Sequence, residues 1–178
     1  MLYDQQLPAA GDFDLTLVVR GPEQTLALGR AVAELLHGGE VILLYGPLGA
    51  GKTCFGQGLC SGLKVTDEVV SPTFTLVNTY TGGPWIVHHL DFYRVDPTHD
   101  LNDIGVPDIL DDVFSGQAVA LIEWPEPIMP ELGANEPRVE LLALPGKTPD
   151  ERIWHLRGVP EIPEPWTHLF TSFSATQE

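Results

Sequence analysis

The chain has 178 residues, 43% of them hydrophobic, and its 25 acidic and 9 basic side chains give a net charge of −16 at pH 7. This length and composition predict one soluble globular domain that is long enough to bury a core. Because a field of this sign repels polyphosphate and nucleic acid, the composition argues against a direct, high-affinity nucleic-acid binder.

No apolar run approaches the roughly 20 residues that span a bilayer. The N-terminal residues 1–6 lack the basic and apolar regions of a signal peptide. We therefore expect a cytoplasmic protein with no membrane partner.

The first predicted element is a half-buried strand, because apolar residues at positions 13, 15, 17 and 19 alternate along the chain. A helix should follow from Gly21 to a stop at Gly38-Gly39. Pro22 suits its first position, and Glu23 interacts favourably with the positive end of the helix dipole. From the residues alone Glu23 is a partner of that dipole, and a place near a bound nucleotide is the alternative.

The segment Gly46-Pro47-Leu48-Gly49-Ala50-Gly51-Lys52-Thr53 matches the phosphate-binding loop pattern G-x-x-x-x-G-K-[ST]. An apolar run, 41–45, precedes it, and residues 54–60 can continue as a helix. The glycines let backbone N–H groups turn toward phosphate oxygens, and the helix N-terminus adds partial positive charge. Lys52 would reach the β and γ phosphates, and the Thr53 hydroxyl would bind magnesium. A glycine-rich turn that binds nothing is the alternative.

The two cysteines, Cys54 and Cys60, lie on this predicted helix. Residues six apart on a helix have α-carbons about 9 Å apart, which is too far for a disulfide. We interpret Cys54 as a small helix residue beside the loop rather than as a catalytic thiol.

Residues 73–91 predict a β-hairpin, because two runs rich in β-forming residues flank a Thr-Gly-Gly-Pro turn. Asp91 ends the second run, where phosphate-loop enzymes place the carboxylate that holds the magnesium shell. His88 and His89 occupy adjacent strand positions and point to opposite faces. We interpret them as packing or hydrogen-bonding histidines rather than as a metal site.

Two short helices are expected next, one from Thr98 to Ile104 after an Asp96-Pro97 cap and one from Asp108 to Phe114 after Pro107. This section is the most acidic of the chain, with aspartates at positions 96, 100, 103, 108, 111 and 112. A solvated face is the plain interpretation, and a docking surface for a basic partner is the alternative.

The apolar run 118–122 predicts a strand that is buried on both faces of a parallel sheet. Glu123 follows it directly and would emerge at the same sheet edge as the phosphate loop. Trp124 would either shield that edge or touch the nucleotide or a partner. Prolines at 125, 127 and 130 should end regular structure there.

Residues 139–144 and 152–157 predict a closing hairpin. The domain should therefore cover residues 13–158. Residues 159–178 include three prolines and have few neighbours to pack on, so we expect a largely mobile tail.

Four separated segments coincide with motifs of one known family: the phosphate loop, Ser71-Pro72-Thr73-Phe74, the run H-L-D-F-Y-R at 89–94, and Glu123-Trp124-Pro125. Through them residues 13–158 resemble the bacterial TsaE family, formerly YjeE, the ATPases of tRNA threonylcarbamoyladenosine synthesis. The phosphate loop alone is widespread, whereas the combination of the four motifs is specific. The resemblance implies an α/β fold, a compact P-loop NTPase-like domain with a mixed sheet flanked by helices.

The resemblance also implies a function. Proteins of this family assist a partner pair, TsaB and TsaD, which transfers a threonylcarbamoyl group to the adenosine 3′ of the anticodon in tRNAs that read codons beginning with A. ATP and Mg²⁺ would be the cofactors, and tRNA would be contacted only indirectly, through the partners.

Individual residues take their expected roles from the same resemblance. Thr73 falls in a switch-like segment and Asp91 in an acidic motif, Glu123 matches the magnesium-binding glutamate, and Glu23 matches a position near the nucleotide base. Relatives often have Asp or Asn in place of Pro47 and Thr in place of Cys54, and phosphate binding needs neither side chain. The expected nucleotide-binding residues are Gly46, Leu48, Gly49, Ala50, Gly51, Lys52, Thr53, Cys54, Glu23 and Trp124, and the expected metal ligands are Thr53, Glu123 and Asp91.

The expected reaction is in-line attack of water on the γ-phosphate of ATP, with charge stabilised by Lys52, the loop amides and magnesium. Asp91 and Glu123 would hold the metal shell and orient the water, and Thr73 would sense the γ-phosphate. Arg94 is the sole arginine in a motif near the site, so turnover should be slow without partners.

Two alternatives stay open. A small-molecule P-loop kinase of the same architecture needs a basic lid to exclude water, and residues 95–137 contain no Lys or Arg. A nucleotide-switched assembly module with incidental hydrolysis differs little from an ATPase in sequence.

Overall fold

The computed structural model describes residues 7–96, 99–159, 166 and 171–174. Its centre is one mixed sheet of eight strands in the order β3-β4-β5-β2-β6-β7-β1-β8. The strands are β1 (Leu15–Arg20), β2 (Val41–Tyr45), β3 (Val77–Tyr80), β4 (Ile86–Asp91), β5 (Ala118–Glu123), β6 (Arg138–Pro145), β7 (Glu151–Arg157) and β8 (Thr171–Ser174). The fold is the expected α/β domain.

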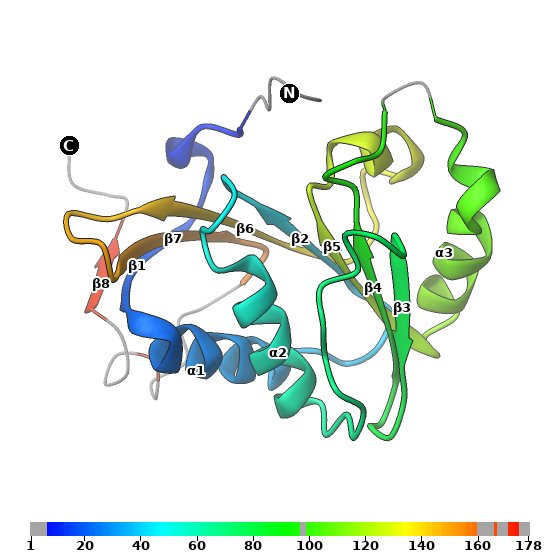
Figure 1. Ribbon diagram of the computed structural model, residues 1–178, viewed down its shortest axis with the longest axis horizontal. Helices are drawn as coiled ribbons and strands as arrows, with labels where there is room; N and C mark the ends of the chain where they lie inside the picture. The colour runs from blue at the N-terminus through cyan, green and yellow to red at the C-terminus, as the bar shows by residue number, and fades with distance from the viewer. Residues whose placement is uncertain (1–6, 97–98, 160–165, 167–170, 175–178) are drawn as a thin grey trace.

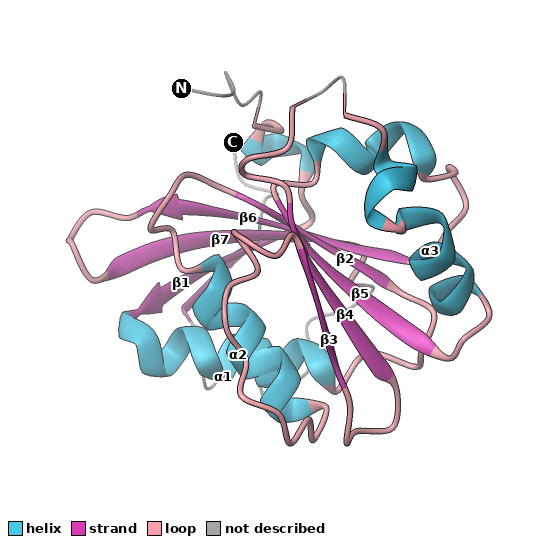
Figure 2. Cartoon of the chain, turned by 45° about the vertical axis from the view of Figure 1, so that its right-hand side comes forward, coloured by secondary structure: helices cyan, strands magenta, loops and turns pink. Residues whose placement is uncertain are grey.

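Helices cover both faces of this twisted sheet (Figures 1 and 2). The α-helices are α1 (Gly21–Ala33), α2 (Lys52–Gly62) and α3 (Val106–Phe114), and the 3₁₀ helices are η1 (Ala10–Asp12), η2 (Leu101–Ile104) and η3 (Glu126–Glu131). Helices α1 and α2 lie side by side on one face, and α3 packs on the other. Alternate residues of β2 point into the two cores, since side chains on a strand alternate between faces.

The four central strands run parallel, with β2 between β5 and β6 and with β4 beside β5. Parallel pairing brings the carboxyl ends of these strands to one edge of the sheet. The register pairs Asp91 with Glu123. The phosphate loop follows β2 at the same edge, so three chemically important segments meet there.

Both predicted hairpins are confirmed, because β3 pairs antiparallel with β4 and β6 with β7. The first helix is shorter than predicted and ends at Ala33 instead of near Gly38. Leu35 and Leu36 donate their N–H groups three residues back, to Val32 and Ala33, so the chain tightens into turns before the glycines.

Two other predictions need correction. The helix expected to start at Thr98 is a 3₁₀ helix over Leu101–Ile104, and Asp100 caps it by accepting a hydrogen bond from the Asn102 N–H. Residues 97–98, where its start and part of its cap were predicted, lie outside the described residues. Prolines 125, 127 and 130 do not end regular structure. They lie in or next to η3, whose short i to i+3 turns tolerate missing N–H donors.

The sheet extends past residue 158, where we predicted that the domain ends. Strand β8 pairs antiparallel with β1, and the Trp166 side chain is only 2% exposed and belongs to the core beneath α1. Val159 is also buried in this core, and residues 160–165, 167–170 and 175–178 of the predicted mobile tail lie outside the described part of the chain.

Helices α1 and α2 approach so closely that their crossing has room only for glycine. A β-carbon on Gly29 would lie 2.3 Å from the carbonyl oxygen of Phe55, and one on Gly58 would lie 2.2 Å from the carbonyl oxygen of Leu26. The two backbones therefore touch directly, and α2 is held against α1 along its length. None of the helices in the described residues is long and apolar enough to cross a membrane.

Candidate nucleotide site

The phosphate loop connects the end of β2 to the start of α2, in the predicted strand-loop-helix order. Gly46 has a φ of 137°, and a β-carbon there would lie 2.4 Å from the carbonyl oxygen of Ala143, so this position requires glycine. Gly51, with a φ of 100°, turns the chain into α2. The first N–H groups of α2 have no partner within the helix, which is the feature that helix N-termini use to bind anions.

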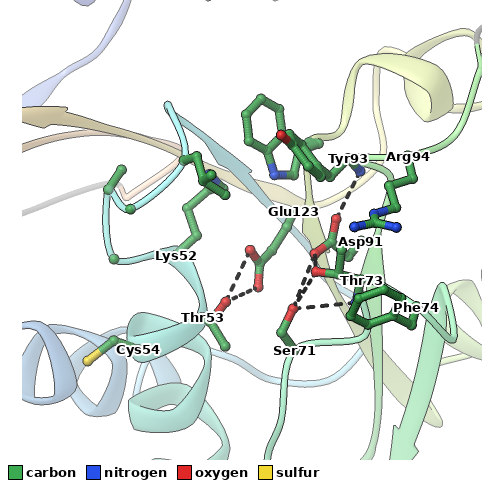
Figure 3. Close-up of a pocket in the computed structure, with 15 residues that line it drawn as sticks. Lys52, Thr53, Cys54, Ser71, Thr73, Phe74, Asp91, Tyr93, Arg94 and Glu123 are labelled. Atoms are coloured by element: carbon green, nitrogen blue, oxygen red, sulfur yellow. Dashed lines mark hydrogen bonds between the residues drawn. The ribbon is translucent and has the colours of Figure 1, made fainter. Parts of the chain in front are cut away.

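A pocket of about 630 Å³ opens in front of this loop (Figure 3). Its lining joins the loop to the segment 71–74 and to the ends of β4 and β5. The lining residues are Leu48, Gly49, Ala50, Gly51, Lys52, Thr53, Cys54, Ser71, Thr73, Phe74, Asp91, Tyr93, Arg94, Glu123 and Trp124.

Glu123 lies at the buried side of the pocket, between a hydroxyl and an imidazole. The Thr53 hydroxyl donates to Glu123 Oε1 at 3.1 Å, with Oε2 at 3.4 Å. The Nε2 atom of His89, which is fully buried on β4, lies 3.0 Å from the same Oε1. Because Glu123 is only 3% exposed, these two donors compensate for much of its lost hydration.

Asp91 organises the other wall of the pocket. Its Oδ2 accepts a hydrogen bond from the Thr73 hydroxyl at 2.7 Å and a longer one from the Ser71 hydroxyl at 3.4 Å. Its Oδ1 accepts from the backbone N–H of Tyr93 at 2.9 Å. The segment 71–74, in which Ser71 and Phe74 are exposed, is therefore tied to a buried carboxylate, as Figure 3 shows.

Lys52 is buried behind the loop, and its side chain is hydrogen-bonded to backbone carbonyl groups of the loop. Its Nζ donates to the carbonyl oxygens of Gly46 at 2.7 Å and Pro47 at 3.1 Å. It also lies 4.2 Å from the ring centroid of Trp124, which is a cation–π distance. Burial lowers the pKa of Lys52, and the negative charges of Glu123 and Asp91 oppose that shift.

Trp124 adopts a left-handed conformation, with a φ of 57°. For a bulky residue this costs on the order of 1–3 kcal/mol and persists only where the surroundings enforce it. Its N–H donates to the carbonyl oxygen of Leu44 at 3.2 Å, and its ring contacts that of Tyr93 with centroids 4.9 Å apart. The strained backbone turns the indole from the end of β5 across the pocket toward Lys52.

The mouth of the pocket carries apolar side chains. Leu48 is 74% exposed and Phe74 is 83% exposed, and the Arg94 guanidinium lies 4.5 Å from the Phe74 ring centroid. On the outer side of the loop, Arg152 of β7 lies 3.4 Å from the Gly49 carbonyl oxygen. Arg152 thus contacts the loop itself, whereas Arg94 contacts Phe74 of the segment 71–74.

The donor set fits a nucleotide triphosphate with Mg²⁺. Because the Thr53 hydroxyl gives its proton to Glu123, its lone pairs are left for a cation. The described residues contain no cluster of three or more His, Cys, Asp or Glu side chains that would form an all-protein cage. Proteins usually hold Mg²⁺ by one or two carboxylates together with water and phosphate, and the oxygens of this pocket fit that mode.

Eleven predicted site residues meet in this pocket: Leu48, Gly49, Ala50, Gly51, Lys52, Thr53, Cys54, Thr73, Asp91, Glu123 and Trp124. Gly46 lies just behind them and contributes its carbonyl oxygen to Lys52. Glu23 is exposed in the first turn of α1 and is not part of the lining. It lies near enough to Cys54 for its charge to raise the pKa of that thiol, although burial is the larger cause.

Four contacts of the site were not predicted. Ser71 and Tyr93 stand inside motifs that were recognised, and only their partners were missed. His89 was interpreted as a packing or hydrogen-bonding histidine; it is both buried and hydrogen-bonded, and its partner Glu123 was not predicted. Arg152 belongs to no motif, and only the pairing of β6 with β7 brings it to the loop.

Comparison with known proteins gives a consistent family. The model of the family described as "Threonylcarbamoyl adenosine biosynthesis protein TsaE" matches residues 19–151. The "tRNA threonylcarbamoyladenosine biosynthesis protein TsaE" of Nostoc sp. is 45% identical over 104 residues, which are 58% of this chain and 64% of that protein. The protein of the same name from Treponema pallidum is 41% identical over 115 residues, 65% of this chain and 82% of that protein.

The likeness extends to three dimensions. The crystal structure of Bacillus subtilis YdiB matches with a TM-score of 0.65 and 30% identity, covering 88% of this chain and 90% of that one. The Bacillus subtilis relative named TsaE is 42% identical over 103 residues, 58% of this chain and 61% of that protein. The chain thus spans slightly less than two thirds of the length of the Nostoc and Bacillus relatives.

Proposed function

This chain belongs to the TsaE family of threonylcarbamoyl adenosine biosynthesis proteins, and on that premise we propose that it is an ATPase that serves the t6A modification of tRNA. Its partners are TsaB and TsaD, and it assists that pair in modifying the adenosine 3′ of the anticodon in tRNAs that read codons beginning with A. It contacts tRNA only through these partners.

One observation carries the ATPase proposal. The phosphate loop and two carboxylates from neighbouring parallel strands converge on one pocket, and Thr53 is already bound to Glu123. A glycine turn without a ligand has no use for a buried lysine opposite two acids. The net charge of −16 supports the division of labour, because a field of that sign disfavours direct tRNA binding.

The chemistry follows from the residues in the pocket. On binding ATP, the Lys52 ammonium exchanges the carbonyl oxygens of Gly46 and Pro47 for phosphate oxygens, and loop N–H groups donate to the same phosphates. Thr53 and Glu123 would hold Mg²⁺, with Asp91 nearby, and the cation would neutralise charge on the β- and γ-phosphate oxygens.

Asp91 lines the pocket, and its carboxylate can accept a hydrogen bond from water and orient it for in-line attack. The water oxygen bonds to the γ-phosphorus as the bond from that phosphorus to the ADP oxygen breaks. ATP and water thereby yield ADP and inorganic phosphate. The Arg94 guanidinium lies against the Phe74 ring in the lining of the pocket, and we expect slow turnover by the isolated chain.

The direct test is phosphate release from ATP by the purified chain with Mg²⁺. The Lys52→Ala variant should lose hydrolysis while its circular dichroism spectrum stays that of the wild type. Undiminished turnover in the folded variant would overturn the assignment. A phosphorylated metabolite in place of free phosphate would instead support the P-loop kinase alternative.

The partner proposal needs a separate test. The chain should co-purify with TsaB and TsaD in an ATP-dependent manner and restore t6A formation to that pair in a reconstituted assay. If Asp91→Asn, inactive in hydrolysis, restored t6A to the wild-type level, the nucleotide would act as an assembly switch and hydrolysis would be incidental.

A further inference from the structure

His89 has a contact that its place in the core does not explain. The side chain is fully buried, yet Nε2 lies 3.0 Å from Glu123 Oε1, which is also bound by Thr53. The ring is held from two other sides. The Tyr80 ring centroid is 6.1 Å away, and a β-carbon on Gly56 of α2 would lie 3.8 Å from His89 Cε1.

The two ring nitrogens of His89 have different surroundings. An ionised carboxylate only accepts hydrogen bonds, so Nε2 carries the proton that is shared with Glu123. Nδ1 is buried and has no hydrogen-bond partner among the described residues. All of the polar interaction of this imidazole is therefore directed at one oxygen of Glu123.

As a consequence, the two oxygens of the Glu123 carboxylate differ in their hydrogen bonding. Oε1 receives both His89 and Thr53, whereas Oε2 has only a longer contact of 3.4 Å with Thr53. A glutamate without this second donor could rotate about its terminal bonds and turn either oxygen to the pocket. His89 removes that freedom from the rear, without entering the pocket lining.

We propose that His89 is a positioning residue: its Nε2–H holds Glu123 so that the carboxylate and the Thr53 hydroxyl together face the Mg²⁺ shell of the nucleotide. This inference rests on the proposed nucleotide site and adds a residue to it that touches neither nucleotide nor metal. Partners of metal-binding side chains commonly act in this way, and their loss typically lowers metal affinity about 10- to 100-fold.

The neighbouring His88 provides a matched control. It lies on the same strand, is 7% exposed, and faces the opposite side of the sheet, where its ring nitrogens meet Thr79 at 3.1 Å and Asp112 at 3.3 Å. A substitution at His88 disturbs a buried histidine of β4 to a similar extent and leaves Glu123 untouched.

The experiment measures ADP binding by calorimetry and takes the ratio of the affinity with Mg²⁺ to the affinity with EDTA. His89→Phe keeps the ring volume and removes the donor, while His89→Gln places an amide N–H near the position of Nε2. We expect His89→Phe to lower the ratio about tenfold or more, His89→Gln to keep it within about threefold, and His88→Phe to leave it unchanged.

An unchanged ratio in folded His89→Phe would overturn the inference, and an equal loss of affinity with and without Mg²⁺ gives this result, because a merely structural role lowers both affinities alike. Failure of His89→Gln to restore the ratio would also overturn it. If His89→Phe does not fold, His89→Leu gives the same comparison. A wild-type chain that binds no nucleotide in either condition would instead refute the proposed function itself.

Discussion

Gly29→Ala tests whether the contact between α1 and α2 supports the nucleotide site. The added β-carbon would lie 2.3 Å from the Phe55 carbonyl oxygen and 2.6 Å from the Leu59 nitrogen. Because ordinary contacts begin near 3.4 Å, the helices must separate by about 1 Å, and over-packing of this kind costs about 1–3 kcal/mol.

Both of the nearest atoms belong to backbone, which cannot turn aside as a side chain can, so the cost should lie near the upper end of that range. Alanine returns about 1 kcal/mol through its higher helix propensity. We expect a net loss of about 2 kcal/mol in the free energy of unfolding, which corresponds to a fall in Tm of about 4–8 °C for a chain of this size.

Thermal and urea unfolding followed by circular dichroism measure this loss. Gly11→Ala is the matched control, because a β-carbon there meets nothing within 4 Å. It should change the free energy of unfolding by less than about 1 kcal/mol. Since α2 begins with Lys52, Gly29→Ala should also weaken ADP binding at temperatures where it is folded. Unfolding curves that coincide for the two variants would refute the close backbone contact and the bracing role inferred from it.

Three further predictions concern single side chains. Burial raises the pKa of Cys54, with a smaller contribution from Glu23, and raises that of Cys60 to about 12. Iodoacetamide should therefore label Cys54 slowly at pH 7.5 and faster at pH 9, and it should leave Cys60 unlabelled in the folded chain. MgADP should block the labelling of Cys54. Mass spectrometry that finds Cys54 labelled equally with and without MgADP would contradict its place in the pocket. Burial lowers the pKa of His155 below 6.5, so the unfolded chain binds the extra proton and the free energy of unfolding should fall as the pH drops below 6.5 through the folded-state pKa. Urea titrations of His155→Gln should show a smaller fall than the wild type over that window, and identical slopes would exclude the effect. Thr73→Val should lower the rate of phosphate release at least about tenfold with ADP affinity unchanged, and an unchanged rate would remove Thr73 from the mechanism.

Local patterns were sufficient to predict the parts of the site that lie along one segment. The phosphate loop is contiguous in the sequence, and the backbone geometry that requires its glycines is known from the loop pattern itself. Asp91 and Glu123 could be paired in advance because each follows an apolar strand, and parallel strands end at a common edge.

Two of the contacts that the sequence did not predict, those of His89 and Arg152, depend on pairing across strands. His89 faces Glu123 only because β4 and β5 are in a particular register, and the periodicity of β4 shows that His89 points inward without showing what it meets. Arg152 reaches the loop from β7, about a hundred residues further along the chain. The early end of α1 was missed for another reason, since i to i+3 turns and α-helical turns share the same apolar spacing at that length.

The bond between Thr73 and Asp91 implies a competition for a single hydrogen. The Thr73 hydroxyl has one proton to give, and here it is given to Asp91 at 2.7 Å. Any state in which Thr73 donates to a phosphate oxygen must first give up that bond. Asp91 then loses one of its donors, and in the proposed mechanism this is the moment when it orients water. Under the roles proposed for these two residues, sensing of the γ-phosphate by Thr73 and release of the Asp91 carboxylate are the same event.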